Sequence, residues 1–238
     1  NAPATFQRLM NEVFHDFIRA GFVVVYLDDV LVFSKTEEEH LAHLEGVFQR
    51  LREHNLFAKL VKCDFWKRQL RYLGHIIGEN GLHVDPDKVK IVAEWPIPPN
   101  VTEVRRFLGL ANYFRKFVQG YSMVAAPLTK LTGSKTTWKW GKEEQEAFDT
   151  LKRKLGEAPV LTLPDVQKPF QVVCDASDYG LGAVLLQDGK VVAYYSKKLN
   201  AAEKNYSTTE KELLAVVTAL TEWRCYVLGK PVLSLIHI

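Results

Sequence analysis

Cysteine is scarce in this chain of 238 residues, and long apolar runs are absent. The three cysteines, Cys63, Cys174 and Cys225, are odd in number and far apart, which argues against a disulfide framework or a local zinc motif. No apolar run approaches the ~20 residues of a membrane span, and the polar first stretch lacks the apolar core of a signal peptide. We therefore expect reduced, mostly buried thiols in an intracellular, reducing compartment, with no membrane partner. The chain also lacks an initiator methionine, which fits a piece of a longer polypeptide.

The composition that remains is that of a globular protein, with 47% hydrophobic and 25% charged residues. Its net charge is only +3, but the charge is unevenly placed. Residues 101–142 hold eight Lys or Arg against one acidic residue, and residues 59–72 hold five against one. Such basic stripes suit a phosphate backbone, with an ordinary solvated surface as the alternative. The interleaved Tyr72, Tyr113, Trp138 and Trp140 favour nucleic acid, because their rings could stack on bases or sugars.

Two adjacent carboxylates stand in the most apolar part of the chain. Residues 22–33 read Phe-Val-Val-Val-Tyr-Leu-Asp-Asp-Val-Leu-Val-Phe, and this pattern predicts two short strands joined by a tight hairpin. Asp28 and Asp29 would lie at its tip. Carboxylates beside buried strands are costly unless they are neutralised or coordinate a metal, and hard cations such as Mg²⁺ prefer oxygen ligands. An ordinary turn is the alternative, since Asp is common in turns.

Local signals place the other elements. A helix over 4–20 should end at Gly21, and Thr36 with Glu39 predicts a capping box for the helix that carries His40 and His43. We expect these two histidines to be exposed, because no third metal ligand is nearby. A strand over 71–77 and a turn at Asn80-Gly81 come next. Helices then start at Asp85-Pro86 and at Asn100, and the second should bury Phe107 and leave its basic residues facing a duplex or solvent.

A second pair of carboxylates lies near the C-terminus. A strand over 170–174 ends at Asp175, a hairpin follows around Asp188-Gly189, and Ser207 with Glu210 caps a helix that contains Glu212 and is closed by Gly229. An Asp at a strand end that faces a helix Glu can hold metal ions for phosphodiester hydrolysis. Either residue alone would be unremarkable.

These motifs resemble, in order, those of one enzyme family. Tyr26-Leu27-Asp28-Asp29 resembles the Tyr-X-Asp-Asp box of reverse transcriptases, and residues 1–11 resemble the palm helix before it in gypsy-type long-terminal-repeat retrotransposons. Tyr72-Leu73-Gly74-His75 resembles the primer-grip hairpin, and residues 105–117 resemble the thumb. Residues 175–182 and 208–214 resemble the first two RNase H motifs. The resemblance covers roughly residues 1–233.

The resemblance implies an α+β fold. Its parts would be the C-terminal part of a polymerase palm (residues 1–78), a helical thumb and tether (79–164) and a truncated RNase H-like α/β domain (165–238). It implies an RNA-directed DNA polymerase with RNase H, in which a primer 3′-hydroxyl attacks a nucleotide α-phosphate held by two Mg²⁺ ions, with Mn²⁺ as the alternative metal. The implied catalytic and metal-binding residues are Asp28, Asp29, Asp175 and Glu212. The expected nucleic-acid contacts are Tyr26, Tyr72, Leu73, Gly74, His75, Arg105, Arg106, Arg115 and Lys116.

The implied partners are an RNA or DNA template-primer, an RNA–DNA hybrid, deoxynucleotides and the other parts of a Gag-Pol-type polyprotein. The implied location is a cytoplasmic virus-like particle or the nucleus. In this family the first catalytic aspartate, the nucleotide-binding strand and the fingers would lie upstream of Asn1. Ile236 stands where the family has a third RNase H carboxylate, and Ile cannot ligate Mg²⁺. We therefore expect this chain alone neither to extend primers nor to cleave a labelled hybrid. A pararetroviral polymerase and a non-catalytic nucleic-acid-binding relic are the alternatives.

Overall fold

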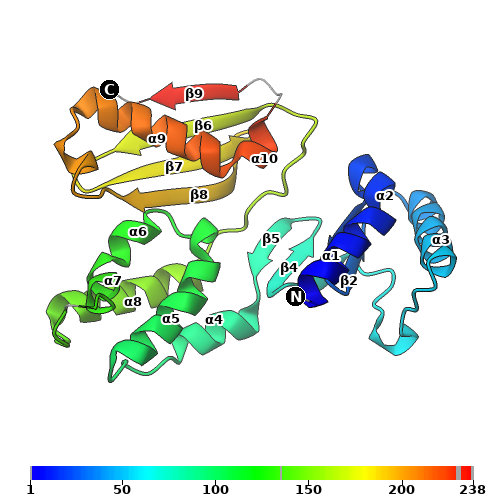
Figure 1. Ribbon diagram of the computed structural model, residues 1–238, viewed down its shortest axis with the longest axis horizontal. Helices are drawn as coiled ribbons and strands as arrows, with labels where there is room; N and C mark the ends of the chain where they lie inside the picture. The colour runs from blue at the N-terminus through cyan, green and yellow to red at the C-terminus, as the bar shows by residue number, and fades with distance from the viewer. Residues whose placement is uncertain (1, 135, 229–231, 237–238) are drawn as a thin grey trace. The chain divides into compact units, whose positions relative to one another are not determined.

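The computed structural model describes residues 2–134, 136–228 and 232–236. The chain forms two compact units that meet in sequence at Lys67 and Arg68 (Figure 1). Among the described residues, the first unit has one hydrophobic core and the second has two. No helix in the described ranges is long and apolar enough to cross a bilayer.

The first unit combines short helices with one hairpin. Its elements are α1 (Ala2–Val13), α2 (His15–Ala20), β1 (Val23–Tyr26), β2 (Asp29–Val32), α3 (Glu37–Glu53) and the 3₁₀ turn η1 (Leu60–Lys62). The single helix predicted over 4–20 is wrong in one respect, because it breaks at Phe14, whose side chain is fully buried. Gly21 ends α2 in the left-handed conformation, and Thr36 Oγ1 accepts from the Glu39 N–H, both as predicted.

The second unit begins with a three-stranded antiparallel sheet of β3 (Gln69–Tyr72), β4 (His75–Gly78) and β5 (Gly81–Val84). The sequence predicted one strand over 71–77, and this is wrong. The chain turns at Leu73 and Gly74, which have φ values of 49° and 70°. Two positive φ values in a two-residue loop are those of a type I′ turn, whose twist matches paired strands.

Helices and 3₁₀ turns follow, namely α4 (Pro86–Ala93), α5 (Val101–Tyr113), η2 (Arg115–Phe117), α6 (Tyr121–Val124), α7 (Ala126–Leu131) and α8 (Lys142–Gly156). Asp85 and Asn100 accept the predicted N-terminal hydrogen bonds of α4 and α5. The predicted inner side of α5 is confirmed, since Val104, Phe107 and Ala111 are all fully buried.

A four-stranded sheet ends the chain, in the order β8-β7-β6-β9. Strands β6 (Phe170–Ala176), β7 (Gly180–Gln187) and β8 (Lys190–Lys198) are antiparallel, and β9 (Val232–Ile236) pairs parallel with β6. The 3₁₀ turn η3 (Glu203–Asn205) leads to α9 (Thr208–Glu222) and α10 (Arg224–Val227), and α9 lies across one face of the sheet (Figure 1). The predicted hairpin at Asp188-Gly189 is confirmed. The predicted stop at Gly229 lies outside the described residues; α9 itself ends before Trp223.

A backbone strap joins the two sheets of the second unit. Leu82 and Leu161 exchange both of their backbone hydrogen bonds, and the Thr162 N–H donates to Val191 of β8. Gly81, at φ 117°, makes room for this strap, because a Cβ there would lie 2.3 Å from the Leu161 carbonyl oxygen. The segment that follows α8 therefore ties β5 to the C-terminal sheet.

The thiols differ in their exposure. All three are free; Cys174 is buried, Cys63 is half-buried and Cys225 is exposed. Burial, and then the nearby Glu212, raise the pKa of Cys174 to about 11. The expectation of mostly buried thiols therefore holds for Cys174 alone.

Candidate functional site

The first pair of carboxylates lies at the hairpin of β1 and β2. Leu27 and Asp28 form its two-residue loop, while Asp29 opens β2 and pairs with Tyr26. The prediction that both aspartates share the tip is therefore correct only for Asp28. Both side chains are exposed. Leu27 has φ 52°, a conformation that costs a non-glycine residue about 1–3 kcal/mol and is common at functional sites.

One side chain of α1 holds this loop in place. Gln7 Oε1 accepts the Leu27 N–H at 2.5 Å, and Gln7 Nε2 donates to the Val25 carbonyl at 3.3 Å. The same Nε2 also donates to Asn11 Oδ1 at 2.8 Å. Gln7 therefore offsets the strain of the Leu27 conformation. Sequence reasoning missed this role, because only the fold brings α1 beside the loop.

The prediction that the two histidines of α3 are exposed is wrong. Their Nδ1 atoms both lie near Ser34 Oγ, at 3.1 Å for His40 and 2.7 Å for His43. The His43 ring also stacks on Phe22 at 3.8 Å. The cluster fastens the start of α3 to the end of β2, so the histidines have a structural use here.

The predicted basic surface divides into two parts. Arg105 and Arg106 are exposed; Arg105 donates to the Thr132 carbonyl, and Arg106 pairs with Glu103 at 2.6 Å. Arg115 and Lys116 are half-buried, contrary to the expectation that they face outward. Desolvation by burial lowers the pKa of Lys116, whose ammonium lies over the Phe117 ring.

Arg115 instead joins the helical region to the C-terminal sheet. Its guanidinium donates to the Ser196 carbonyl of β8 at 2.6 Å and lies 5.6 Å from the Tyr195 ring. Ser122 adds two bonds to the same residue, from its N–H to Ser196 Oγ and from its hydroxyl to the Ser196 carbonyl. No local signal could have found this joint, since the partners are 81 residues apart.

The aromatic residues of the stripe are also less available than the sequence suggested. Trp138 and Trp140 pack against the core of the helical region. The indole N–H of Trp140 donates to Gln145, and its ring meets Phe148 edge-on. These two rings are therefore structural in this fold.

The second pair of carboxylates flanks the end of β6. Asp175 is exposed, and Glu212 of α9 is buried with its Oε1 accepting the Ala176 N–H at 3.2 Å. Glu212 Oε2 is buried without a hydrogen-bond partner in the described part of the chain. A buried carboxylate oxygen without a donor is costly, and a bound cation would satisfy it. Strand β9 places position 236 in register with Cys174, one residue before Asp175.

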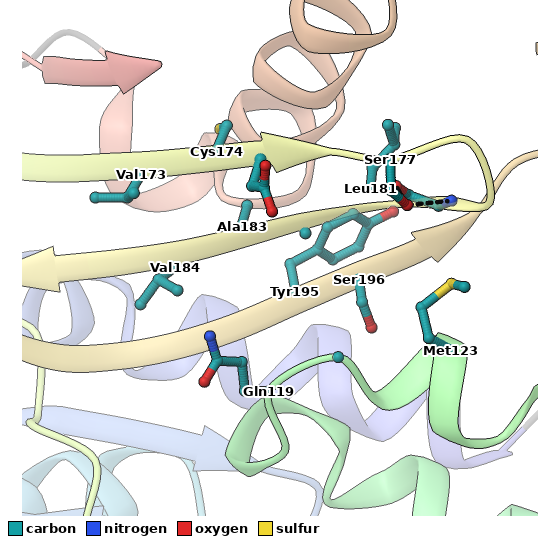
Figure 2. Close-up of a pocket in the computed structure, with 14 residues that line it drawn as sticks. Gln119, Met123, Val173, Cys174, Ser177, Leu181, Ala183, Val184, Tyr195 and Ser196 are labelled. Atoms are coloured by element: carbon teal, nitrogen blue, oxygen red, sulfur yellow. Dashed lines mark hydrogen bonds between the residues drawn. The ribbon is translucent and has the colours of Figure 1, made fainter. Parts of the chain in front are cut away.

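A cavity of about 270 Å³ lies on the other side of this strand end (Figure 2). Gln119 and Met123 form one wall, and Val184 and Tyr195 of the sheet face them. Asp175 also lines the cavity. Lys211 of α9 is buried and pairs with Asp178 at 2.8 Å; this ion pair holds the loop after β6 and lowers the pKa of Asp178.

No cluster of three or more His, Cys, Asp or Glu side chains is placed to hold a metal within the described ranges. Each site instead offers two carboxylates. Oxygen donors of this kind suit Mg²⁺, and the partnerless Glu212 oxygen fits a cation at the second site.

Each pair of carboxylates lies within a stretch of the chain that matches a known family. Residues 1–77 match the family "Reverse transcriptase (RNA-dependent DNA polymerase)", and residues 140–233 match the "RNase H-like domain found in reverse transcriptase". The chain belongs to the reverse transcriptase family. It is 43% identical over 97% of its length to the retrovirus-related Pol polyprotein from transposon 297 of Drosophila melanogaster. It is 38% identical over 94% of its length to the transposon Tf2-3 polyprotein of Schizosaccharomyces pombe. These relatives confirm the resemblance to retrotransposon reverse transcriptases.

Solved structures confirm the α+β fold. The foamy viral protease-reverse transcriptase in complex with RNA/DNA hybrid matches all of this chain, with a TM-score of 0.88 and 26% identity, over 33% of its own length. The same viral protein in complex with dsDNA matches with a TM-score of 0.85, over 50% of its length. The chain spans 22% of the transposon 297 polyprotein and 17% of the Tf2-3 polyprotein. The domain boundaries predicted at 78 and 164 stay predictions, as do the individual site residues.

Proposed function

We propose that this chain forms part of an RNA-directed DNA polymerase, supplying the Asp-Asp loop, the primer grip, the thumb and an RNase H-like domain to a longer polyprotein. One observation carries the proposal: Asp28 and Asp29 are exposed at a strained hairpin that Gln7 holds from α1. A strained loop is stabilised here at the position of two carboxylates, which suits a reaction site more than a plain turn.

Asp28 and Asp29 would hold Mg²⁺, or Mn²⁺ in its place, at the polymerase site, and Asp175 with Glu212 would hold it at the RNase H-like site. When bound, such an ion stabilises negative charge that develops on phosphoryl-transfer oxygens. The protein's own part is to fix where the carboxylates lie. Gln7 does so through the Leu27 N–H, and the Ala176 N–H orients Glu212.

The proposed partners are a template-primer duplex and an RNA–DNA hybrid. The solved relatives support this, because their complexes hold dsDNA and RNA/DNA hybrid. Arg105 and Arg106 are exposed cations of α5 that would contact phosphates. Tyr26 and the Tyr72–His75 hairpin would lie near the primer end.

The test is primer extension by the full-length reverse transcriptase that contains this chain. Metal-held charge stabilisation contributes several kcal/mol, so Asp28→Asn should lower the extension rate by roughly 10³-fold. Binding of the primer-template should change little, because the carboxylate contacts metal and not the duplex. The rate and the dissociation constant are measured on the same labelled oligonucleotide.

Asp64→Asn is the matched control, since Asp64 is also exposed and lies in the same unit. It should extend primers at the unaltered rate. Full activity of Asp28→Asn would refute the assignment of the polymerase site.

A further inference from the structure

The turn between β3 and β4 is strained at Leu73. This residue has φ 49°, in the left-handed region that Gly and Asn adopt readily and a branched apolar side chain does not. Type I′ turns favour Asn-Gly, whereas this one is Leu-Gly. The turn therefore needs support from outside the hairpin.

Tyr113, the last residue of α5, supplies that support. Its hydroxyl donates to the Leu73 carbonyl. Its ring carbon Cε1 lies 3.7 Å from where a Cβ on Gly74 would be, so the ring also covers the second turn residue. One side chain thus contacts both residues of the turn.

His75 extends this contact into the core of the thumb. Its ring stacks on Tyr113 at 5.3 Å with an interplanar angle of 11°. Phe114 meets the same ring edge-on at 5.5 Å, and Phe117 lies at 5.6 Å. His75 is only 8% exposed. The turn, Tyr113, His75 and the end of α5 therefore pack as one assembly.

We propose that Tyr113 is a positioning residue for the primer end, which fixes the primer-grip turn to the thumb helix through its hydroxyl and ring. The proposal rests on the proposed polymerase function, because it gives the turn its role. Tyr113 would not touch the reacting atoms. It would hold the Leu73–Gly74 backbone where the primer strand must rest, and a small displacement of reacting groups is costly in rate.

Tyr113→Phe in the full-length reverse transcriptase tests this directly. Phe keeps the ring, and so keeps any stacking on a base, but loses the hydrogen bond to Leu73. A hydrogen bond contributes on the order of a tenfold change or less, so the single-turnover extension rate should fall about fivefold. The burst amplitude, which counts correctly folded enzyme, and the primer-template dissociation constant should stay within twofold of the unaltered enzyme.

Tyr121→Phe is the matched control, because the Tyr121 hydroxyl also donates to a backbone carbonyl, but to that of Leu108 in α5 and not to one in the turn. It should leave the rate unchanged. In a Leu73→Asn background, where Asn-Gly favours the turn by itself, the loss caused by Tyr113→Phe should shrink to less than twofold.

Three results would overturn the proposal. The first is an unchanged extension rate in Tyr113→Phe. The second is a loss confined to burst amplitude, which indicates a purely structural role, and the third is a loss confined to duplex affinity, which indicates direct binding. If the unaltered enzyme fails to extend primers, the proposed function itself fails, and this proposal fails with it.

Discussion

At the scale of single residues, the side chains that hold the functional loops take no part in the proposed chemistry. Gln7 and Tyr113 each bind the backbone of a strained turn, at Leu27 and at Leu73. Lys211 instead holds the loop after β6 through an ion pair with the Asp178 side chain. Non-glycine residues with a positive φ persist only where surrounding contacts hold their backbone in that conformation.

Gln7→Met should release the Asp-Asp loop. Met has a similar length but cannot accept the Leu27 N–H, and an unsatisfied donor costs about 1–3 kcal/mol. We expect amide hydrogen exchange at Leu27 to accelerate by about tenfold or more, and the extension rate of the full-length enzyme to fall in parallel.

Gln49→Met is the matched control, because Gln49 is exposed on α3 and donates to Glu53 one turn along the same helix. It should leave Leu27 exchange unchanged. Equal exchange rates in the two variants would show that Gln7 does not restrain the loop.

At the scale of elements, the contacts of η2 and α6 with β8 change the interpretation of the basic residues in 101–142. Arg115 has the charge that suits a phosphate, but the Ser196 carbonyl and the Tyr195 ring occupy its guanidinium. The nucleic-acid role predicted for Arg115 stays a prediction, and the geometry assigns it a structural one as well.

Arg115→Met should lower the free energy of unfolding by about 2 kcal/mol, the usual contribution of a hydrogen bond to a charged group. The salt dependence of duplex binding should not change. Urea titration measures the first quantity, and the slope of log affinity against log salt measures the second.

Arg105→Met with Arg106→Met is the comparison, since both side chains are exposed on the preceding helix. Each lost phosphate contact should flatten the slope by roughly 0.9, with little effect on stability. A slope change in Arg115→Met of the size expected for one lost phosphate contact would place Arg115 on the duplex instead.

At the scale of the whole molecule, folding stability should decrease with acidification, and His75 should be a large contributor. Burial first, and Lys116 second, lower the pKa of His75 from 6.5 to about 4. Between pH 6.5 and about pH 4, His75 is protonated in the unfolded chain but not in the folded chain. Acidification therefore favours unfolding across this window. Lys211 and Lys197 lower the carboxyl pKa values of Asp178 and Glu203, and that stabilisation is also lost as the pH falls through the folded values.

His75→Phe should remove the histidine part of this dependence. Phe can keep the stack with Tyr113 without titrating. Between pH 7 and pH 4 the unaltered chain should lose about 3 kcal/mol more than the variant, from the shift in the His75 pKa. Urea unfolding followed by tryptophan fluorescence measures this, because four of the five tryptophans lie after Lys67. Parallel pH curves for the two proteins would contradict the prediction.

The sequence by itself determined the elements whose stabilising contacts are local. The caps at Thr36, Asp85, Asn100 and Ser207 and the turn at Asp188-Gly189 all form as their residues predict, because each depends on backbone groups within about four positions. The motifs around Asp28 and Asp175 also identified the family, since their order along the chain is itself sequence information.

Only the tertiary structure decided how these parts are held. The break at Phe14, the use of His40 and His43 on Ser34, and the inward turn of Arg115 were all predicted differently. Gln7 reaches a loop 20 residues away, Tyr113 reaches a turn 40 residues away, and Arg115 reaches a strand 81 residues away. A long polar side chain has the same local preferences whether it faces water or a distant carbonyl, so its partner is set by packing and by the cost of leaving buried backbone groups unpaired.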